Sequence, residues 1–261
     1  MITAASNSRI KRLVQLNQKP KLRRTEDVFL AEGVKMFLEA PREQLQEVYV
    51  SESFLEKCSC REYLEEVGYE VVSDSVFSKI SDTCTPQGIL CVLKQFHYNI
   101  EEMLRDKAPL FLLLENIQDP GNLGTMLRTG EGAGVSGIIM SRDTVDLYNP
   151  KVIRSTMGSI YRVPFYYADD FAAAVHQVQQ AGISVYAAHL RGKNSYACQD
   201  YTKGTAFLIG NEGNGLREET AELADCYIRI PMEGKVESLN AAVASSILMY
   251  EAHRQRATIE K

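Results

Sequence analysis

The chain has 261 residues, of which 45% are hydrophobic and 24% charged, as is usual for a globular protein of one large or two modest domains. Its formal net charge of −5 excludes a surface that is basic throughout, and no apolar run is long enough to span a bilayer. The N-terminus has no hydrophobic core of a signal peptide, which together with the cysteine pattern favours a cytoplasmic protein.

The six cysteines contain no C-x-x-C pair, and the four histidines lie far apart. This spacing argues against a structural zinc site, so no metal is expected. The cysteines are interpreted as reduced thiols.

Residues 1–25 are locally basic, with no Asp or Glu. Such a cluster is suited to neutralising the backbone phosphates of a nucleic acid. A solvated helix face without a nucleic-acid partner has the same composition. Its basic residues are Arg9, Lys11, Arg12, Lys19, Lys21, Arg23 and Arg24.

The first part of the chain predicts a small α/β domain over residues 1–98. An apolar stripe through Ile10 and Leu13 indicates a first helix at residues 7–18, which Ser6 is expected to cap and Pro20 to end. The other elements expected are strands at 28–31, 48–50, 69–72 and 89–93, and helices at 33–40 and 61–67.

Residues 99–108 are polar and end before a proline, so we place a linker there and a second α/β domain at 109–261. Strands alternating with helices favour a mostly parallel sheet flanked by helices. The strands are expected at 110–114, 137–140, 162–166, 183–188, 205–209 and 226–230. The helices are expected at 122–133, 150–157, 169–181, 216–223 and 238–255.

Three segments follow strands of this second domain, where ligands of parallel sheets bind. The first runs from Glu115 to Arg128, with a turn before a helix that Asn122 opens. The second has three glycines within six residues around Glu212, and it is neither a dinucleotide fingerprint nor a phosphate-binding P-loop. Helix caps and tight turns would explain each segment taken alone.

The third segment starts at Pro231, which stops the strand ladder, and leads into a helix near Ser238. The small residues after Asn240 allow another backbone to pack closely against that helix.

In order and spacing, these segments resemble the SpoU (TrmH) family of RNA 2′-O-ribose methyltransferases. The resemblance covers residues 109–255, with no departure at the motif positions. The matching residues are Asn122 and Arg128, then Gly210, Glu212 and Gly213, then Pro231, Ser238, Leu239 and Asn240. Residues 7–11 and 29–33 are similar to the L30e-like substrate-binding domain that precedes the catalytic domain in many rRNA-modifying members.

The resemblance implies a deep trefoil knot, which spacing alone would not reveal. It also implies S-adenosyl-L-methionine as cofactor and a homodimer with active-site groups contributed across the interface. The cofactor residues expected from it are His189, Leu190, Leu208, Ile209, Gly210, Ile230, Met232, Ser238 and Leu239.

The implied reaction transfers a methyl group to a ribose 2′-hydroxyl, and 23S ribosomal RNA is the expected substrate. Arg128 is expected to position a phosphate or the 2′-oxygen and to stabilise negative charge, although a role as base stays open. Asn122 and Glu212 are expected to hydrogen-bond each other, and Ser238 and Asn240 to anchor the ribose or Arg128.

The residues expected to contact RNA are Arg9, Lys11, Arg12, Lys21, Arg23, Arg24 and Arg154. Three alternatives stay open at this point: a tRNA 2′-O-methyltransferase, a non-catalytic RNA-binding assembly factor with the same fold, and a nucleotide-dependent oxidoreductase. The complete motif set argues against the second, and the missing glycine fingerprint against the third.

Overall fold

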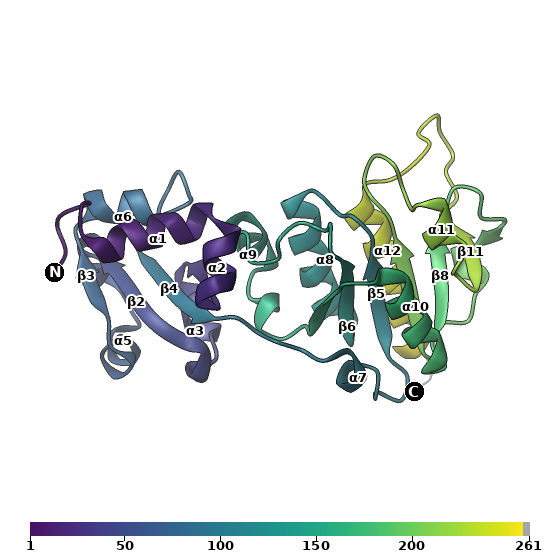
Figure 1. Ribbon diagram of the computed structural model, residues 1–261, viewed down its shortest axis with the longest axis horizontal. Coiled ribbons are helices and arrows are strands. Elements are labelled where there is room, and N and C mark those ends of the chain that lie inside the picture. Colours follow the sequence, from purple (N-terminus) through teal and green to yellow (C-terminus); the bar gives the residue numbers. More distant parts are fainter. Residues whose placement is uncertain (258–261) are drawn as a thin grey trace. The chain divides into compact units, whose positions relative to one another are not determined.

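Two β-sheets organise the chain, one in each of two structural units (Figure 1). The computed structural model describes residues 1–257. The first unit consists of Met1–Phe96 and Asp146–Tyr161, and the second of His97–Val145 with the chain from Arg162 onward. The sequence had placed everything after residue 108 in one domain.

Segment Asp146–Tyr161 belongs to the first unit because it is bonded there. The buried guanidinium of Arg23 binds Asp146 at 2.5 Å, and Tyr161 Oη donates to the carbonyl of Met36 at 3.0 Å. Helix α9 (Pro150–Thr156) lies in this segment and packs on strand β1 (Val28–Glu32).

The first unit is built on a mixed four-stranded sheet of order β1-β4-β2-β3. Strand β4 (Ile89–Lys94) runs antiparallel to β1 and to β2 (Leu45–Ser51), whereas β3 (Glu70–Val72) is parallel to β2. Its other helices are α1 (Ser8–Gln18), α2 (Pro20–Glu26), α3 (Val34–Glu39), α4 (Glu52–Lys57), α5 (Arg61–Val67) and α6 (Asp74–Ile80).

Helix α1 lies where the apolar stripe predicted it, with Ile10 and Leu13 buried in the core of the first unit. Its cap differs from the prediction, because the side chain of Asn7 rather than Ser6 accepts from the backbone of Arg9. Pro20 does follow the helix, and it also starts α2, where its fixed φ and missing N–H cost nothing at the first helical position.

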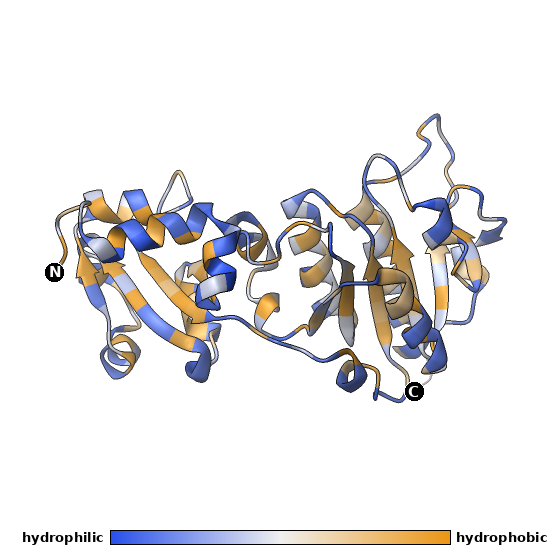
Figure 2. Ribbon diagram, viewed as in Figure 1, coloured by the Kyte–Doolittle hydropathy of each residue, from blue (hydrophilic) through white to orange (hydrophobic). Residues whose placement is uncertain are grey.

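The second unit has a seven-stranded sheet of order β7-β6-β5-β10-β8-β11-β9, and every pairing within the described residues is parallel, as predicted. Central strands β5 and β10 are entirely buried, and Figure 2 shows them as apolar. The strands are β5 (Leu110–Leu114), β6 (Gly137–Ser141), β7 (Phe165–Ala168), β8 (Ser184–Ala188), β9 (Asn194–Ser195), β10 (Thr205–Ile209) and β11 (Cys226–Arg229).

Helices cover both faces of this sheet (Figure 1). On one face, Val175 and Val178 of α10 pack with Leu208. Side chains alternate along a strand, so Phe207 and Ile209 face the opposite side, where α8 and α12 pack together. The helices are α7 (Ile100–Met103), α8 (Pro120–Ala133), α10 (Phe171–Gln180), α11 (Glu218–Ala221) and α12 (Ala241–Ala257).

None of the helices within residues 1–257 is long and apolar enough to cross a membrane. Helix α12 begins three residues later than predicted, at Ala241. Asn240 stands just before it and accepts from the backbone of Ala242 and Val243 at 2.9 and 3.2 Å, so this residue acts as the cap.

Candidate active site

Three segments meet beyond the carboxyl ends of parallel strands in the second unit. They follow β5, β10 and β11, and they carry Asn122, Glu212 and Asn240 respectively. This edge of a parallel sheet is where α/β proteins bind ligands.

Asn122 uses both ends of its side-chain amide. Its Nδ2 donates to Glu212 Oε1 at 2.9 Å, which is the hydrogen bond that the sequence predicted. Its Oδ1 accepts from Asn240 Nδ2, also at 2.9 Å. Asn240 therefore bonds Asn122 and not Arg128, one of the two partners expected for it. The three side chains form a chain of two hydrogen bonds, here called the relay, that links all three segments.

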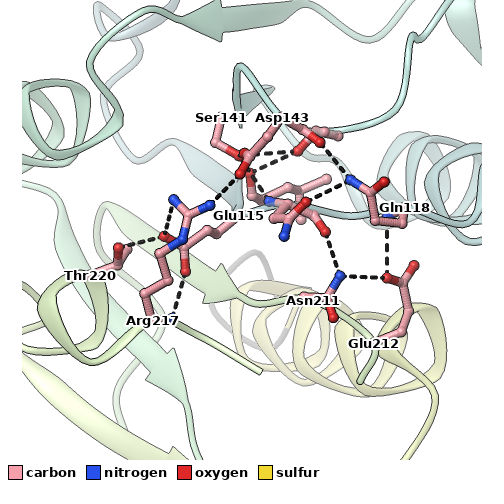
Figure 3. Close-up of polar contacts among 11 residues, drawn as sticks. Glu115, Gln118, Ser141, Asp143, Asn211, Glu212, Arg217 and Thr220 are labelled. Atoms are coloured by element: carbon pink, nitrogen blue, oxygen red, sulfur yellow. Dashed lines mark hydrogen bonds and ion pairs between the residues drawn. The ribbon is translucent and has the colours of Figure 1, made fainter. Parts of the chain in front are cut away.

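Glu212 also binds the backbone that leads into α8. Its carboxylate accepts from Asp119 N at 3.0 Å and Gln118 N at 3.1 Å (Figure 3 shows the Gln118 contact). Desolvation acts to raise the pKa of Glu212, but the hydrogen bonds from Asn122, Asp119 and Gln118 outweigh it, and the pKa lies below its ordinary value. Glu212 is therefore ionised at neutral pH and suited to holding N–H groups in place.

The start of α8 is set by local sequence. Asp119 caps the helix by accepting from Asn122 N at 2.8 Å, and Pro120 occupies the first turn. A Cβ on Gly121 would lie 2.9 Å from Asp119 Oδ1, so a larger residue there would displace the capping carboxylate. These contacts fix the backbone of Asn122.

A pocket of about 260 Å³ opens beside the relay, and Glu212 lines it. Eight of the nine predicted cofactor residues line it: His189, Leu190, Ile209, Gly210, Ile230, Met232, Ser238 and Leu239. Leu208 is not among the pocket-lining residues, because the alternation of β10 turns its side chain into the core under α10. Sequence reasoning missed Ala188, Leu216, Ile228, Ala241, Ala244 and Leu248, of which the small α12 residues were noticed only as a packing surface.

Residues 210–215, which we call the glycine loop, form one wall of this pocket. This loop closes tightly on itself. Asn211 and Gly215 exchange two backbone hydrogen bonds, at 3.0 and 2.9 Å, and Gly215 has a positive φ of 69°. A Cβ on Gly210 would lie 2.2 Å from the carbonyl carbon of Gly215, so only glycine fits there. The wall therefore presents backbone groups to a ligand.

His189 lines the pocket from the end of β8. Its Nδ1 accepts from Arg191 N at 3.1 Å, and its ring centroid lies 5.1 Å from that of Tyr227. Desolvation and the charge of Arg191 lower the pKa of His189, with Glu218 opposing them. The imidazole is thus neutral at neutral pH and adds no positive charge beside a cationic ligand.

Arg128 is exposed on α8 and is not among the pocket-lining residues. It makes no hydrogen bond or ion pair within residues 1–257. The structure thus brings together Asn122, Glu212 and Asn240 beside a pocket that Ser238 lines, whereas Arg128 stays outside this pocket.

The residues predicted to contact RNA all lie in the first unit and differ in availability. Lys11, Lys21 and Arg24 are exposed and have no acidic partner in the described part of the chain, as is also true of Lys19. Other members of the set are ion-paired, Arg9 with Glu70, Arg12 with Glu26 and Glu47, and Arg154 with Asp82.

Arg23 is a correction to that set. It is only 2% exposed, and it donates to the carbonyls of Leu16 and Asn17 as well as binding Asp146. Its guanidinium holds α1, α2 and the segment after Val145 together and does not face solvent, so it is not available to a phosphate.

Comparisons with known proteins agree with this geometry. Residues 109–250 match the SpoU rRNA Methylase family, and residues 7–91 match the MRM3-like substrate binding domain. The 23S rRNA (guanosine(2553)-2′-O)-methyltransferase RlmP of Bacillus subtilis is 32% identical over 95% of this chain and 97% of its own length.

Two solved structures are similar over nearly the whole chain. The AdoMet-bound rRNA methyltransferase from Sinorhizobium meliloti has a TM-score of 0.83 and 31% identity, with 97% of each chain covered. AviRb from Streptomyces viridochromogenes, in complex with AdoMet, has a TM-score of 0.87 and 25% identity, with 97% of this chain and 99% of that one covered.

Proposed function

The chain belongs to the SpoU rRNA methylase family, and on that premise we propose that it transfers a methyl group from S-adenosyl-L-methionine to a ribose 2′-hydroxyl of 23S ribosomal RNA. The observation that carries this proposal is the Asn240–Asn122–Glu212 relay beside a backbone-lined pocket. A protein that had lost its activity would have no need to keep all three side chains bonded to one another.

The pocket fits the cofactor by its chemistry. Leu239, Ile230 and Leu248 offer apolar surface to a purine ring, and the Gly210 wall offers backbone groups to polar atoms. His189 is neutral, and this suits a ligand that carries a sulfonium charge. When bound, S-adenosyl-L-methionine supplies an electrophilic methyl group.

The protein's own residues orient the nucleophile. A 2′-hydroxyl attacks poorly unless it is held in line and its developing charge is stabilised. Glu212 stays ionised and fully engaged with N–H donors, so its role is to hold the loop and Asn122. Arg128 carries a permanent positive charge, which suits it to stabilise the oxyanion or to position a phosphate.

We assign Arg128 to the pocket of a second copy of the chain, in a homodimer formed by the exposed face of α8 and α12. That face carries two large apolar residues of α12, Val243 and Tyr250, which are 47% and 49% exposed. Gly132 of α8 adjoins it, since a Cβ there would lie 3.1 Å from Tyr250 Oη. An exposed apolar face of this kind is typical of a protein–protein interface. Arg128 projects from the same exposed side of α8.

The trefoil knot expected from the family is also a proposal for this chain. It is supported by the match of residues 109–250 to the SpoU rRNA Methylase family.

The first unit is proposed to bind the RNA backbone through exposed cations of α1, α2 and the residue between them. These are Lys11, Lys19, Lys21 and Arg24. Its match to a substrate binding domain supports this role. We also propose a cytoplasmic location, which a ribosomal RNA substrate supports.

Mapping ribose methylation in total RNA from a strain without this protein, and from the same strain complemented, tests the substrate. We expect one 2′-O-methyl position in 23S rRNA to disappear and return. Loss of a tRNA position would support the tRNA alternative, and an unchanged map would contradict the proposal.

A further inference from the structure

A second polar network holds the downstream end of the glycine loop, and Figure 3 shows its contacts. It starts at Glu115, the first residue after β5, whose side chain is 2% exposed. This carboxylate accepts from Arg217 N at 2.8 Å and from Thr220 Oγ1 at 2.5 Å, and its Oε1 lies 3.5 Å from Arg217 Nη1. Glu115 therefore fastens the downstream end of the glycine loop to the end of β5.

Arg217 carries the network onward to the loop after β6. Its Nη2 forms an ion pair with Asp143, which also accepts from Ser141 Oγ at 2.5 Å. Desolvation acts to raise the pKa of Asp143, but Ser141 and Arg217 outweigh it and the pKa is lowered. One guanidinium thus joins two carboxylates from two different strand ends.

The network then returns to the relay through Gln118. Gln118 Nε2 donates to the carbonyl of Asp143 at 2.5 Å, and Gln118 N donates to Glu212 at 3.1 Å. The glycine loop is therefore held at its start by Glu212 and at its end by Arg217, and both anchors lead to the loop between β5 and α8.

We propose that Glu115 and Arg217 are positioning residues that set the shape of the cofactor pocket by clamping the end of the glycine loop. This inference rests on the proposed function, because it concerns the same pocket. Glu115 is too deeply buried to touch a ligand, and Arg217 is not among the pocket-lining residues. Their effect passes through Leu216 and Gly215, which line the pocket directly before Arg217.

Calorimetric titration of S-adenosyl-L-methionine into the full chain tests the clamp. The variants are Glu115→Gln, Arg217→Gln and Arg217→Lys. Arg162→Gln is the matched control, because Arg162 and its partner Glu131 are 42% and 33% exposed, against 50% and 41% for Arg217 and Asp143. Methyl-transfer kinetics on the same samples separate KM for the cofactor from kcat.

We expect Kd and KM for the cofactor to rise on the order of tenfold in Glu115→Gln and Arg217→Gln, with binding stoichiometry near that of the unchanged protein. Arg217→Lys keeps a charge for Asp143 and should recover part of the affinity, and Arg162→Gln should leave Kd unchanged. A lower stoichiometry with unchanged Kd would mean that these residues only support folding, and would overturn the inference. If the unchanged protein bound no cofactor, the proposed function would fail and this inference with it.

Discussion

The side-chain amide of Asn122 and the carboxylate of Glu212 are hydrogen-bonded at 2.9 Å although 90 residues separate them in the chain. This bond joins the start of α8 to the glycine loop, and Asn240 extends it to the start of α12. Each of the three sequence motifs therefore contributes one member to a single polar relay, which accounts for their joint presence.

The strength of this link is measurable by a double-mutant cycle. We expect Asn122→Ala and Glu212→Ala to be coupled by about 1 kcal/mol in the free energy of unfolding, since the bond is charge-assisted but partly exposed. Denaturant unfolding of the two single variants and the double variant measures this coupling. Strict additivity of the two single effects would contradict a direct interaction.

The contribution of Glu212 to stability should depend on pH. Because hydrogen bonds lower its pKa from the ordinary value of 4.5, the folded state favours the ionised form, and the stabilisation is complete above that value. It is lost as the pH falls below 4.5 through the folded pKa. The difference in unfolding free energy between the unchanged protein and Glu212→Gln should shrink over this range, and a difference that stayed constant down to pH 3 would disprove the assignment.

Arg128→Ala should lower methyl transfer on the order of 100-fold or more while cofactor affinity is retained, because the proposed role of Arg128 is to position the RNA and to stabilise negative charge on the ribose oxygen, not to bind the cofactor. Titration calorimetry and a tritium-transfer assay measure the two quantities. Near-normal turnover would refute the role.

Subunit mixing tests where Arg128 acts. Ala244 lines the pocket, and Ala244→Phe should fill it and block the cofactor. If Arg128 serves the opposite subunit, exchange between inactive Arg128→Ala and inactive Ala244→Phe homodimers recovers about a quarter of normal activity, since half the dimers carry one complete site. No recovery after confirmed exchange would place Arg128 in its own subunit's site.

Arg256 near the end of α12 should be important for stability. It donates to the carbonyls of Tyr201, Ala108, Pro109 and Lys203 at 2.8 to 3.2 Å, and so joins α12 to the chain before β5 and β10. We expect Arg256→Ala to lower the unfolding free energy by about 2 kcal/mol. Thermal and denaturant unfolding measure this loss of stability. Arg254→Ala is the milder control, because Arg254 pairs with Glu251 of its own helix.

Charge reversal on α1 and α2 should weaken RNA binding. Replacing Lys11, Lys21 and Arg24 by Glu removes cations that have no acidic partner among residues 1–257. Affinity should therefore fall, and the salt dependence should flatten by about 0.7 to 0.9 per lost phosphate contact. Arg23→Gln is the contrasting variant, since this buried residue should affect stability instead. Equal salt slopes before and after charge reversal would argue against this RNA surface.

The elements that the sequence predicted well have strong local signals. Strands β5 and β10 lie at the predicted residues because each is a continuous apolar run bounded by polar turns. The missed helices α2 and α6 are seven residues each, too short for a clear amphipathic period, and they are stabilised by packing against α1 and the sheet.

The site could be predicted from the sequence where a motif identified its residues. It could not be predicted where the contacts depend on how the elements pack. The bond between Asn122 and Glu212 was expected from the motifs, whereas the partner of Asn240 depends on how α12 approaches α8. Arg23 and Arg24 are adjacent and carry the same charge, and the sequence does not show that Arg23 is buried against Asp146 whereas Arg24 is exposed.

The central claim is that this relay and pocket deliver a methyl group to a ribose oxygen. Ribosomal RNA incubated with the protein and S-adenosyl-L-methionine bearing a deuterated methyl group, then digested to nucleosides and analysed by mass spectrometry, tests it directly. We expect the label on a 2′-O-methyl nucleoside, and we expect no label when Asn122→Ala replaces the unchanged protein. Label on a base, or equal ribose labelling by both proteins, would contradict it.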